Sequence, residues 1–338
     1  MPTGVSGGAA STEWTSGGRV GPAVPSVVIM WIGNGDTQGH ETIARAAAEM
    51  ARGDKVRASY DLSHEYSDRM PLSPFAEPIS LTYRPTHFIE AHAGNGETIS
   101  GQFGSQGTKI DALGHFGYVE DGEVRYFGGL TQREVKPSDD SPLLRLGADQ
   151  IPPIVTSAVL LDAKRLRGRS LVAGEQVTAA DLEAMLAAQR LRGPLAGDAL
   201  LIHTGWGEKW SADNPEPART EYYGAGPGLS RDAAEHLAAE RVVCIGMDVP
   251  FLDAVATGYL RGTDSPPADA PADLPFVIHH ENLTRAGIYQ VHNMHLGELA
   301  ADEVYLSAVF ILPPRIRGGS NSPVRPVAIG APHRPEPV

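Results

Sequence analysis

The stretch GSQGTKIDALGHFG, residues 104–117, places a lysine, an aspartate and a histidine in one short glycine-rich segment. Glycine permits tight backbone geometry, which allows several side chains to converge from one loop. Lys109 and Asp111 are two positions apart, so in an extended segment both would face the same side. Asp111 and His115 are residue types that hold metals or move protons, yet the cation of Lys109 should repel a metal at Asp111. A surface Lys–Asp pair with a structural histidine is the simpler alternative.

A second group of candidates lies in VIHHENLTRAGIYQVHNMHLGEL, residues 277–299, which contains four of the 12 histidines. Such a cluster indicates a metal site or a proton-transfer site. The part GIYQVHNM is typical of a strand whose alternation puts Ile288, Gln290 and His292 on one side. For His279 and His295 we expect a solvated or structural role instead.

Two aspartates in IGMDVPFLDA, residues 245–254, form a third candidate group. Asp248 and Asp253 follow a predicted buried strand, and ligands of open α/β sheets bind near the carboxyl ends of strands. A role in helix capping or in a turn is the simpler expectation for both carboxylates.

Composition narrows the classes of function. The chain of 338 residues has a formal net charge of −13 and no Lys/Arg cluster, which disfavours a nucleic-acid partner. No stretch reaches the roughly 20 apolar residues of a membrane helix, so we expect no membrane partner. The motifs of serine hydrolases, P-loop nucleotidases and simple dehydrogenases are absent. Cys244 is the single cysteine and lies in an apolar run, so we expect it to be buried in a reducing, cytoplasmic protein.

The organisation of the chain indicates one α/β domain over residues 25–338, preceded by an extended or mobile arm over residues 1–24. Helical periodicity or cap signals predict helices over residues 37–56, 177–191 and 229–242, with Thr178 as an N-cap and Asp181 in the first turn. Apolar or alternating runs predict strands over residues 57–66, 156–163, 198–206 and 242–250.

The segment GTKIDALGHFG resembles the signature of the cyclase-like metal hydrolases, a family that includes bacterial kynurenine formamidase and isatin hydrolase. The family pattern is His-x-Gly-Thr-His-x-Asp-Ala-Pro-x-His-Phe, and it is matched in register by Gly107, Thr108, Asp111, Ala112, His115 and Phe116. Further segments continue the resemblance over residues 58 to 330. The resemblance implies a swivelling β/β/α fold with a mixed sheet and flanking helices, a homo-oligomer (dimer or tetramer), and hydrolysis of an amide or lactone by metal-activated water.

The resemblance also implies roles for single residues. Asp111 and His280 match metal ligands of the family, and His115 matches its general acid/base. Ser105 and Lys109 stand where the family has two ligand histidines. His292 stands where a ligand glutamate is usual, and it keeps a donor that zinc or manganese accepts.

Two enzymatic interpretations and one non-enzymatic interpretation remain open. In the first, Asp111, His280 and His292 hold one Zn²⁺ or Mn²⁺ ion, the Lys109 ammonium replaces a second ion, and His115 moves the proton. In the second, no metal binds, and Lys109, Asp111 and His115 catalyse a cyclisation or dehydration. In the third, the chain binds a small molecule without turning it over.

We expect the substrate to be a small cyclic amide, a lactone or a related carbonyl compound. Ser105, Trp206 and Phe251 are the predicted lining of its pocket, although aromatic residues such as Trp206 and Phe251 are more often plain core residues.

Overall fold

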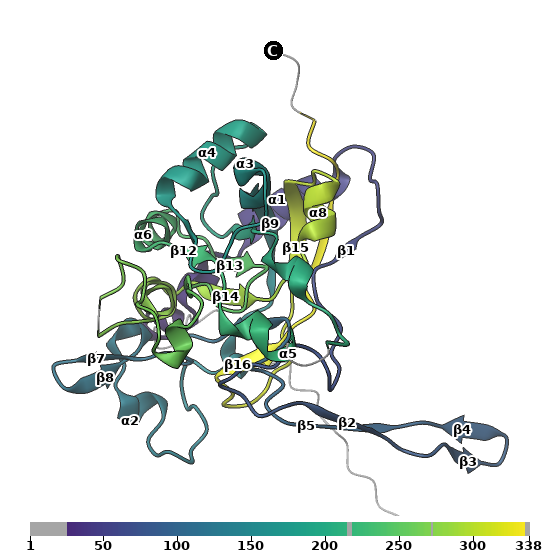
Figure 1. Cartoon of the computed structure of the whole chain (residues 1–338). Coiled ribbons are helices and arrows are strands. Elements are labelled where there is room, and N and C mark those ends of the chain that lie inside the picture. Colours follow the sequence, from purple (N-terminus) through teal and green to yellow (C-terminus); the bar gives the residue numbers. More distant parts are fainter. Residues whose placement is uncertain (1–25, 215–217, 272, 335–338) are drawn as a thin grey trace, which may run out of the picture.

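A nine-stranded mixed sheet forms the centre of the computed structural model, which describes residues 26–214, 218–271 and 273–334. The predicted arm over residues 1–24 lies outside the described residues. The strand order is β1-β17-β15-β9-β11-β13-β14-β6-β16. Figure 1 labels β1, β15, β9, β13, β14 and β16 of this sheet. These strands are β1 (Tyr60–Asp61), β6 (Lys109–Asp111), β9 (Ile154–Asp162), β11 (Ala199–His203), β13 (Cys244–Met247), β14 (Tyr289–His292), β15 (Leu306–Ile311), β16 (Asn321–Pro323) and β17 (Val327–Gly330).

The middle of the sheet is parallel and its two sides are antiparallel. Strands β9, β11, β13 and β14 run parallel to one another, whereas β15, β17 and β1 on one side and β6 and β16 on the other pair antiparallel. The four parallel strands coincide in sequence with four of the predicted strands, those in residues 156–163, 198–206, 242–250 and 287–294. The mixed sheet with flanking helices that the resemblance implied is therefore confirmed.

Short helices connect and cover the strands. They are α1 (His40–Ala51), α2 (Gln132–Val135), α3 (Ala163–Arg167), α4 (Ala179–Gln189), α5 (Ala218–Glu221), α6 (Arg231–Ala239), α7 (Val277–His279), the π-helix η7 (His280–Ala286) and α8 (Gly297–Ala301). The predicted cap of α4 is confirmed, because the Thr178 side chain accepts a hydrogen bond from the Asp181 backbone N–H and the Asp181 side chain bonds back to Thr178.

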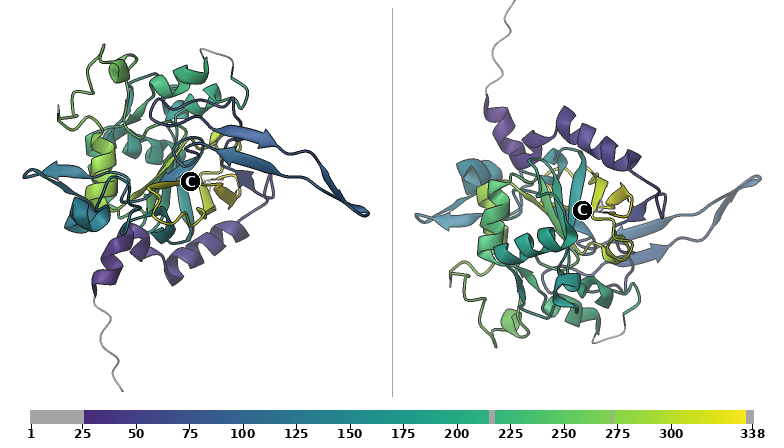
Figure 2. Two further views of the ribbon diagram at one scale, coloured as in Figure 1. Left: turned by 90° about the horizontal axis from the view of Figure 1, so that it is seen from below. Right: turned by 90° about the horizontal axis from the view of Figure 1, so that it is seen from above.

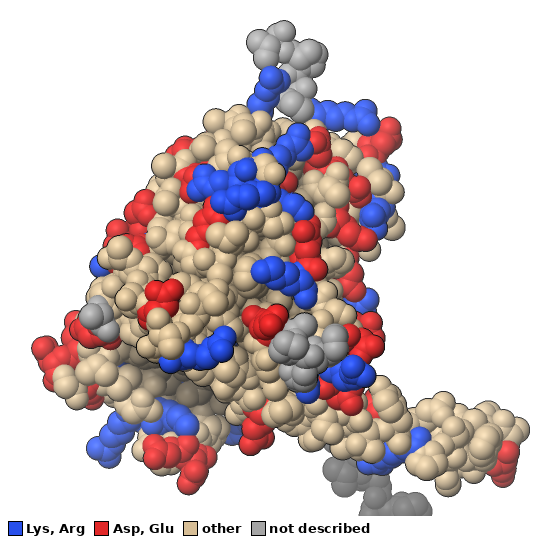
Figure 3. Space-filling view, viewed as in Figure 1, with Lys and Arg blue, Asp and Glu red and all other residues tan. Residues whose placement is uncertain are grey.

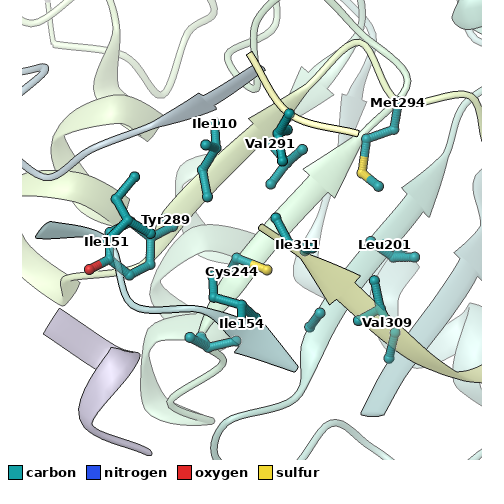
Figure 4. Close-up of a cluster of buried hydrophobic side chains, with 14 of the residues drawn as sticks. Ile110, Ile151, Ile154, Leu201, Cys244, Tyr289, Val291, Met294, Val309 and Ile311 are labelled. Atoms are coloured by element: carbon teal, nitrogen blue, oxygen red, sulfur yellow. The ribbon is translucent and has the colours of Figure 1, made fainter. Parts of the chain in front are cut away.

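Side chains of the central strands alternate between two hydrophobic clusters. Val159 and Leu161 of β9 pack in the cluster that α4 and α6 cover, whereas Leu160 packs in the other. Figure 4 shows part of this second cluster, with Leu201 and Cys244 among its residues. Cys244 is fully buried as predicted, and burial raises the pKa of its thiol to about 12.

The predicted strand over residues 57–66 is reduced to the two residues of β1. After β1 the chain turns, because the Asp61 side chain accepts hydrogen bonds from the backbone N–H and the hydroxyl of Ser63. The His64 backbone N–H then bonds to the Thr108 hydroxyl, which ties this loop to the start of β6.

A long hairpin that the sequence analysis did not predict projects from the body of the molecule (Figures 1 and 2). It consists of β2 (Ser80–Tyr83) paired with β5 (Glu97–Ser100), and β3 (His87–Ile89) paired with β4 (His92–Gly94). In the view of Figure 3 it is mainly uncharged, whereas positive and negative side chains mix over the rest of that face. The homo-oligomer implied by the resemblance stays a prediction.

Smaller ribbons complete the fold: β7 (Tyr118–Glu120) pairs with β8 (Glu123–Arg125), and β10 (Gln176–Val177) pairs with β12 (Gly228–Leu229). Within the described part of the chain, every helix is too short or too polar to cross a bilayer.

Candidate active site

The carboxylate of Asp111 is the centre of a buried cluster of charged and titratable side chains. Lys109 Nζ lies 2.6 Å from Asp111 Oδ1, and His292 Nε2 lies 2.7 Å from Asp111 Oδ2. His115 Nε2 is 3.8 Å from Oδ1, and His279 Nε2 is 3.8 Å from Oδ2. Four side chains, two of them near Asp111 in the sequence and two far from it, thus surround one fully buried carboxylate.

Strand pairing brings these side chains together. Strand β6 lies between β14 and β16, and its Lys109 is directly opposite His292 of β14. Lys109 and Asp111 point to the same side of β6, as their spacing predicted. A turn after β6, closed by the His115 N–H bonding to the Ala112 carbonyl, returns His115 to the carboxylate.

The hydrogen bonds of two histidines fix which ring nitrogen carries the proton. His292 Nδ1 lies 3.1 Å from the Pro250 carbonyl, which can only accept, so Nδ1 donates. His279 Nδ1 lies 2.5 Å from the Asp253 carboxylate and also donates. In the neutral rings, Nε2 of each histidine therefore presents a lone pair toward Asp111.

The contact between His292 Nε2 and Asp111 Oδ2 is unusual, because both atoms are acceptors. Burial, reinforced by the Lys109 charge, lowers the pKa of His292 to about 4, so this ring is neutral near pH 7. Among the described residues neither Nε2 nor Oδ2 has a hydrogen-bond partner. Two facing acceptors 2.7 Å apart repel each other unless a proton or a metal ion lies between them.

The ionisation of Asp111 and His115 follows from their surroundings. Burial opposes the charge on Asp111, but its electrostatic interactions with His115, Lys109 and His292 outweigh burial and hold the pKa of Asp111 well below its usual value. Burial lowers the pKa of His115 to about 3, against the attraction of Asp111. His115 is therefore a neutral imidazole that can accept a proton.

A cavity of about 380 Å³ opens above this cluster. Its polar floor includes Lys109, His115 and His279. Its apolar walls are aromatic, with Phe116 and Phe276 at 6.0 Å and Phe251 and Phe276 at 6.1 Å between ring centroids. On the polar side, Asn321 Nδ2 donates to the Ser105 hydroxyl at 3.1 Å.

Most of the predicted site residues meet in this cavity. Lys109, His115, Ser105 and Phe251 line it, and Asp111 and His292 lie beneath it. Trp206 does not, because the left-handed turn at Gly205 directs its ring into the hydrophobic cluster covered by α4 and α6. The structure therefore does not bring Trp206 to the cavity over Asp111.

His280 does not reach the cluster either, and His279 takes the place expected for it. The His280 ring packs at a tilt against Tyr118, 4.3 Å between centroids, and lines a different cavity. Successive residues of a helix point about 100° apart, so only one of the two adjacent histidines can face Asp111. His279 is not solvated, since it is buried and its Nδ1 bonds to Asp253, and its Nε2 also faces the Asp111 carboxylate.

The two aspartates that follow β13 differ in their hydrogen-bond partners and in their roles. Asp248 accepts hydrogen bonds from the backbone N–H groups of Thr204 and Gly205, which is the structural role expected for it. Asp253 accepts from the Ile278 N–H and from His279 Nδ1. Asp253 is thus a site residue that supports His279; the sequence analysis counted it among the candidates but favoured a capping or turn role.

The residues present fit one metal ion. Asp111, His115 and His279 each offer a ligand atom within 4.8 Å of the others, and His292 Nε2 is closer still to Asp111. The Asp253 carboxylate and the Pro250 carbonyl accept hydrogen bonds from the Nδ1 atoms of His279 and His292, which orients both rings as such partners orient ligand histidines. Lys109 takes the other carboxylate oxygen, so a second ion beside Oδ1 does not fit.

Fold and site together define a mixed α/β protein with a buried Asp–His–Lys centre under an aromatic cavity. The chain belongs to the putative cyclase family, whose sequence model matches residues 60–254. The resemblance inferred from GTKIDALGHFG is thereby confirmed.

Solved structures of the same fold include enzymes. A crystal structure of a novel cyclase is 24% identical over 88% of this chain and 94% of that chain, with a TM-score of 0.75. Isatin hydrolase A from Ralstonia solanacearum is 24% identical over 86% and 98%, with a TM-score of 0.54. Isatin hydrolase A from Labrenzia aggregata bound to benzyl benzoate is 16% identical over 85% and 96%, also with a TM-score of 0.54. No curated protein sequence matches this chain.

Proposed function

We propose that this protein is a hydrolase of a small cyclic amide, lactone or related carbonyl compound, and that it uses one divalent metal ion. The observation that carries the proposal is the pair of facing acceptors, His292 Nε2 and Asp111 Oδ2, with His279 Nε2 directed at the same oxygen. Isatin hydrolases share the fold, which makes a cyclic carbonyl substrate the natural class to test.

Asp111, His279 and His292 are the proposed ligands. A zinc or manganese ion held there would polarise a carbonyl group or lower the pKa of a bound water. Asp253 keeps the Nδ1 proton on His279 and thereby keeps its Nε2 free to coordinate.

Lys109 supplies a fixed positive charge to the cavity. Its ammonium is bound to Asp111 Oδ1, and the same side chain lines the cavity floor. A cation held in a dry site can stabilise the negative charge that develops on a carbonyl oxygen during attack. We assign Lys109 the electrostatic role that a second metal ion would otherwise have.

His115 is the proposed proton carrier. It is a neutral imidazole at the cavity floor, within 3.8 Å of the carboxylate that can stabilise its charged form. It would take a proton from the attacking water and deliver it to the leaving nitrogen or oxygen. The Ser105 hydroxyl, held by Asn321, is placed to hydrogen-bond a substrate oxygen.

The metal-independent cyclase or dehydratase remains the second candidate. One observation favours it: Lys109 already gives Asp111 a cationic partner at 2.6 Å, so the carboxylate is paired without a metal. The non-catalytic binding protein would use the same cavity without turnover.

Metal analysis separates these candidates. We expect plasma mass spectrometry to find about one zinc or manganese ion per chain of the wild-type protein and to find it lost in Asp111→Ala and His279→Ala. His280→Ala is the matched control, since it removes the neighbouring imidazole that does not face Asp111, and it should retain the ion. A wild-type protein that takes up no zinc or manganese would contradict the proposed hydrolase mechanism.

The aromatic walls make a second prediction, about substrate affinity. Phe75 lies at the cavity with 61% of its surface exposed and packs edge-on against Phe251 at 6.1 Å. Phe75→Ala should raise KM for a flat aromatic substrate about tenfold through lost apolar contact, with metal content unchanged. Phe88→Ala on the projecting hairpin, where Phe88 is 71% exposed, is the control. Equal KM values in both variants would remove Phe75 from the binding wall.

A further inference from the structure

A second cavity, of about 540 Å³, lies beside the π-helix η7. His280, Thr284 and Arg285 form its wall on η7, and the β7–β8 hairpin faces them with Tyr118 and Arg125. Among the described residues the two cavities have no lining residue in common. The adjacent histidines of the HH pair therefore serve different cavities, and only the first is used by the proposed hydrolase.

One buried carboxylate holds two arginines side by side at this second cavity. Glu281 is 4% exposed, and its Oε1 lies 3.1 Å from Arg231 Nη2 while its Oε2 accepts from Arg285 Nη1 at 3.0 Å. Two guanidinium groups carry more charge and more N–H donors than one carboxylate can satisfy. Arg231 has a further partner in the exposed Glu235, but both arginines line the cavity.

The other residues that line this cavity are mainly charged, polar or aromatic. Glu120 and Asp273 also line the cavity, and the third arginine of the lining, Arg125, is paired with Glu123, so the candidate anion site is the pair Arg231 and Arg285. Buried His280 Nδ1 has no hydrogen-bond partner among the described residues, and its ring is fixed against Tyr118.

We propose that this second cavity binds a small organic anion, a carboxylate or a phosphate monoester on a flat apolar body. The anionic group would bind between Arg231 and Arg285, which Glu281 holds in a preorganised pair suited to bidentate recognition. The apolar body would lie against Tyr118 and Leu274. The cavity is too large for inorganic phosphate alone to fill, which favours an organic ligand.

Calorimetric titration of the full chain at low ionic strength tests the proposal with three probes: benzoate, phenyl phosphate and inorganic phosphate. We expect one saturable site per chain for at least one of the two aromatic anions, and the tighter of the two identifies the preferred anionic group. Arg231→Gln and Arg285→Gln should each weaken binding about tenfold, the usual loss for a hydrogen bond to a charged group.

Arg57→Gln is the matched control, because Arg57 is also paired with two carboxylates and its side chain is 44% exposed against 37% for Arg231. Tyr118→Ala leaves the Glu281 pairs intact and should weaken the aromatic probes but not inorganic phosphate, which keeps the test valid if an arginine variant fails to fold. Binding that is unchanged in both arginine variants would place the anion elsewhere, for instance beside Lys109. An equal loss in Arg57→Gln, or no saturable binding to the wild type, would also overturn the proposal.

Discussion

In metal-free protein, Lys109→Met is expected to lower the free energy of unfolding by about 3–5 kcal/mol, the usual cost of removing one partner from a buried ion pair. Lys109 is 6% exposed and Asp111 is fully buried, so bulk water has little access to the carboxylate that loses its ammonium partner. Methionine keeps most of the volume of the lysine chain, which limits the cavity contribution to the loss. Urea denaturation followed by circular dichroism, with a chelator present, measures the effect.

The same experiment with zinc or manganese present separates the two enzymatic mechanisms. An ion bound by Asp111, His279 and His292 supplies the positive charge that Lys109→Met removes, and it stabilises the folded state by mass action. The difference between variant and wild type should therefore shrink when metal is added. If the metal leaves the difference unchanged, Asp111 has no metal partner, and the metal-independent mechanism is favoured.

Lys164→Met is the control for the loss of an ion pair as such. Lys164 pairs with Glu208 at the surface, where one third of its side chain is exposed. Surface pairs of this kind contribute about 0–1 kcal/mol, so the control should unfold nearly as the wild type does. A loss for Lys109→Met no larger than that of the control would show that the buried pair contributes no special stability.

The sequence predicts the centre of the fold better than its edges. The parallel strands β9, β11 and β13 are mainly apolar, because both of their faces pack against hydrophobic clusters. Strand β1 and the projecting hairpin have no such pattern. Their conformation depends on side-chain bonds such as Asp61 to Ser63 and on pairing between segments, which local periodicity does not report.

In the candidate site, too, the sequence predicts what depends on neighbouring residues and not what depends on residues far away along the chain. The spacing of Lys109, Asp111 and His115 is enough to predict their convergence, because they share one short strand and the turn that follows it. The choice between His279 and His280 depends on the phase of a helix. That phase is fixed by Asp253, 26 residues away from His279, which bonds to its Nδ1. The HH pair alone carries no signal for this choice.

Among variants that keep the metal ion, His115→Ala should lose the most activity. If His115 carries the proton, His115→Ala should lower kcat for a cyclic amide or lactone about 10²–10⁴-fold, the range for a positioned general acid/base. KM should change little, since the aromatic walls formed by Phe116, Phe251 and Phe276 remain. Turnover of a panel of small lactones and cyclic amides by the metal-loaded protein provides the measurement.

Metal content of the same variant decides between the two roles open to this histidine. His115 Nε2 lies close enough to Asp111 and His279 to be a ligand itself, yet it is on the Oδ1 side of the carboxylate, where Lys109 is bound. We therefore expect His115→Ala to retain its ion while losing turnover. Loss of both the ion and turnover would make His115 a metal ligand and leave Lys109 as the remaining candidate for proton transfer. His236→Ala, which removes a surface histidine that pairs with Glu183, should keep both activity and metal.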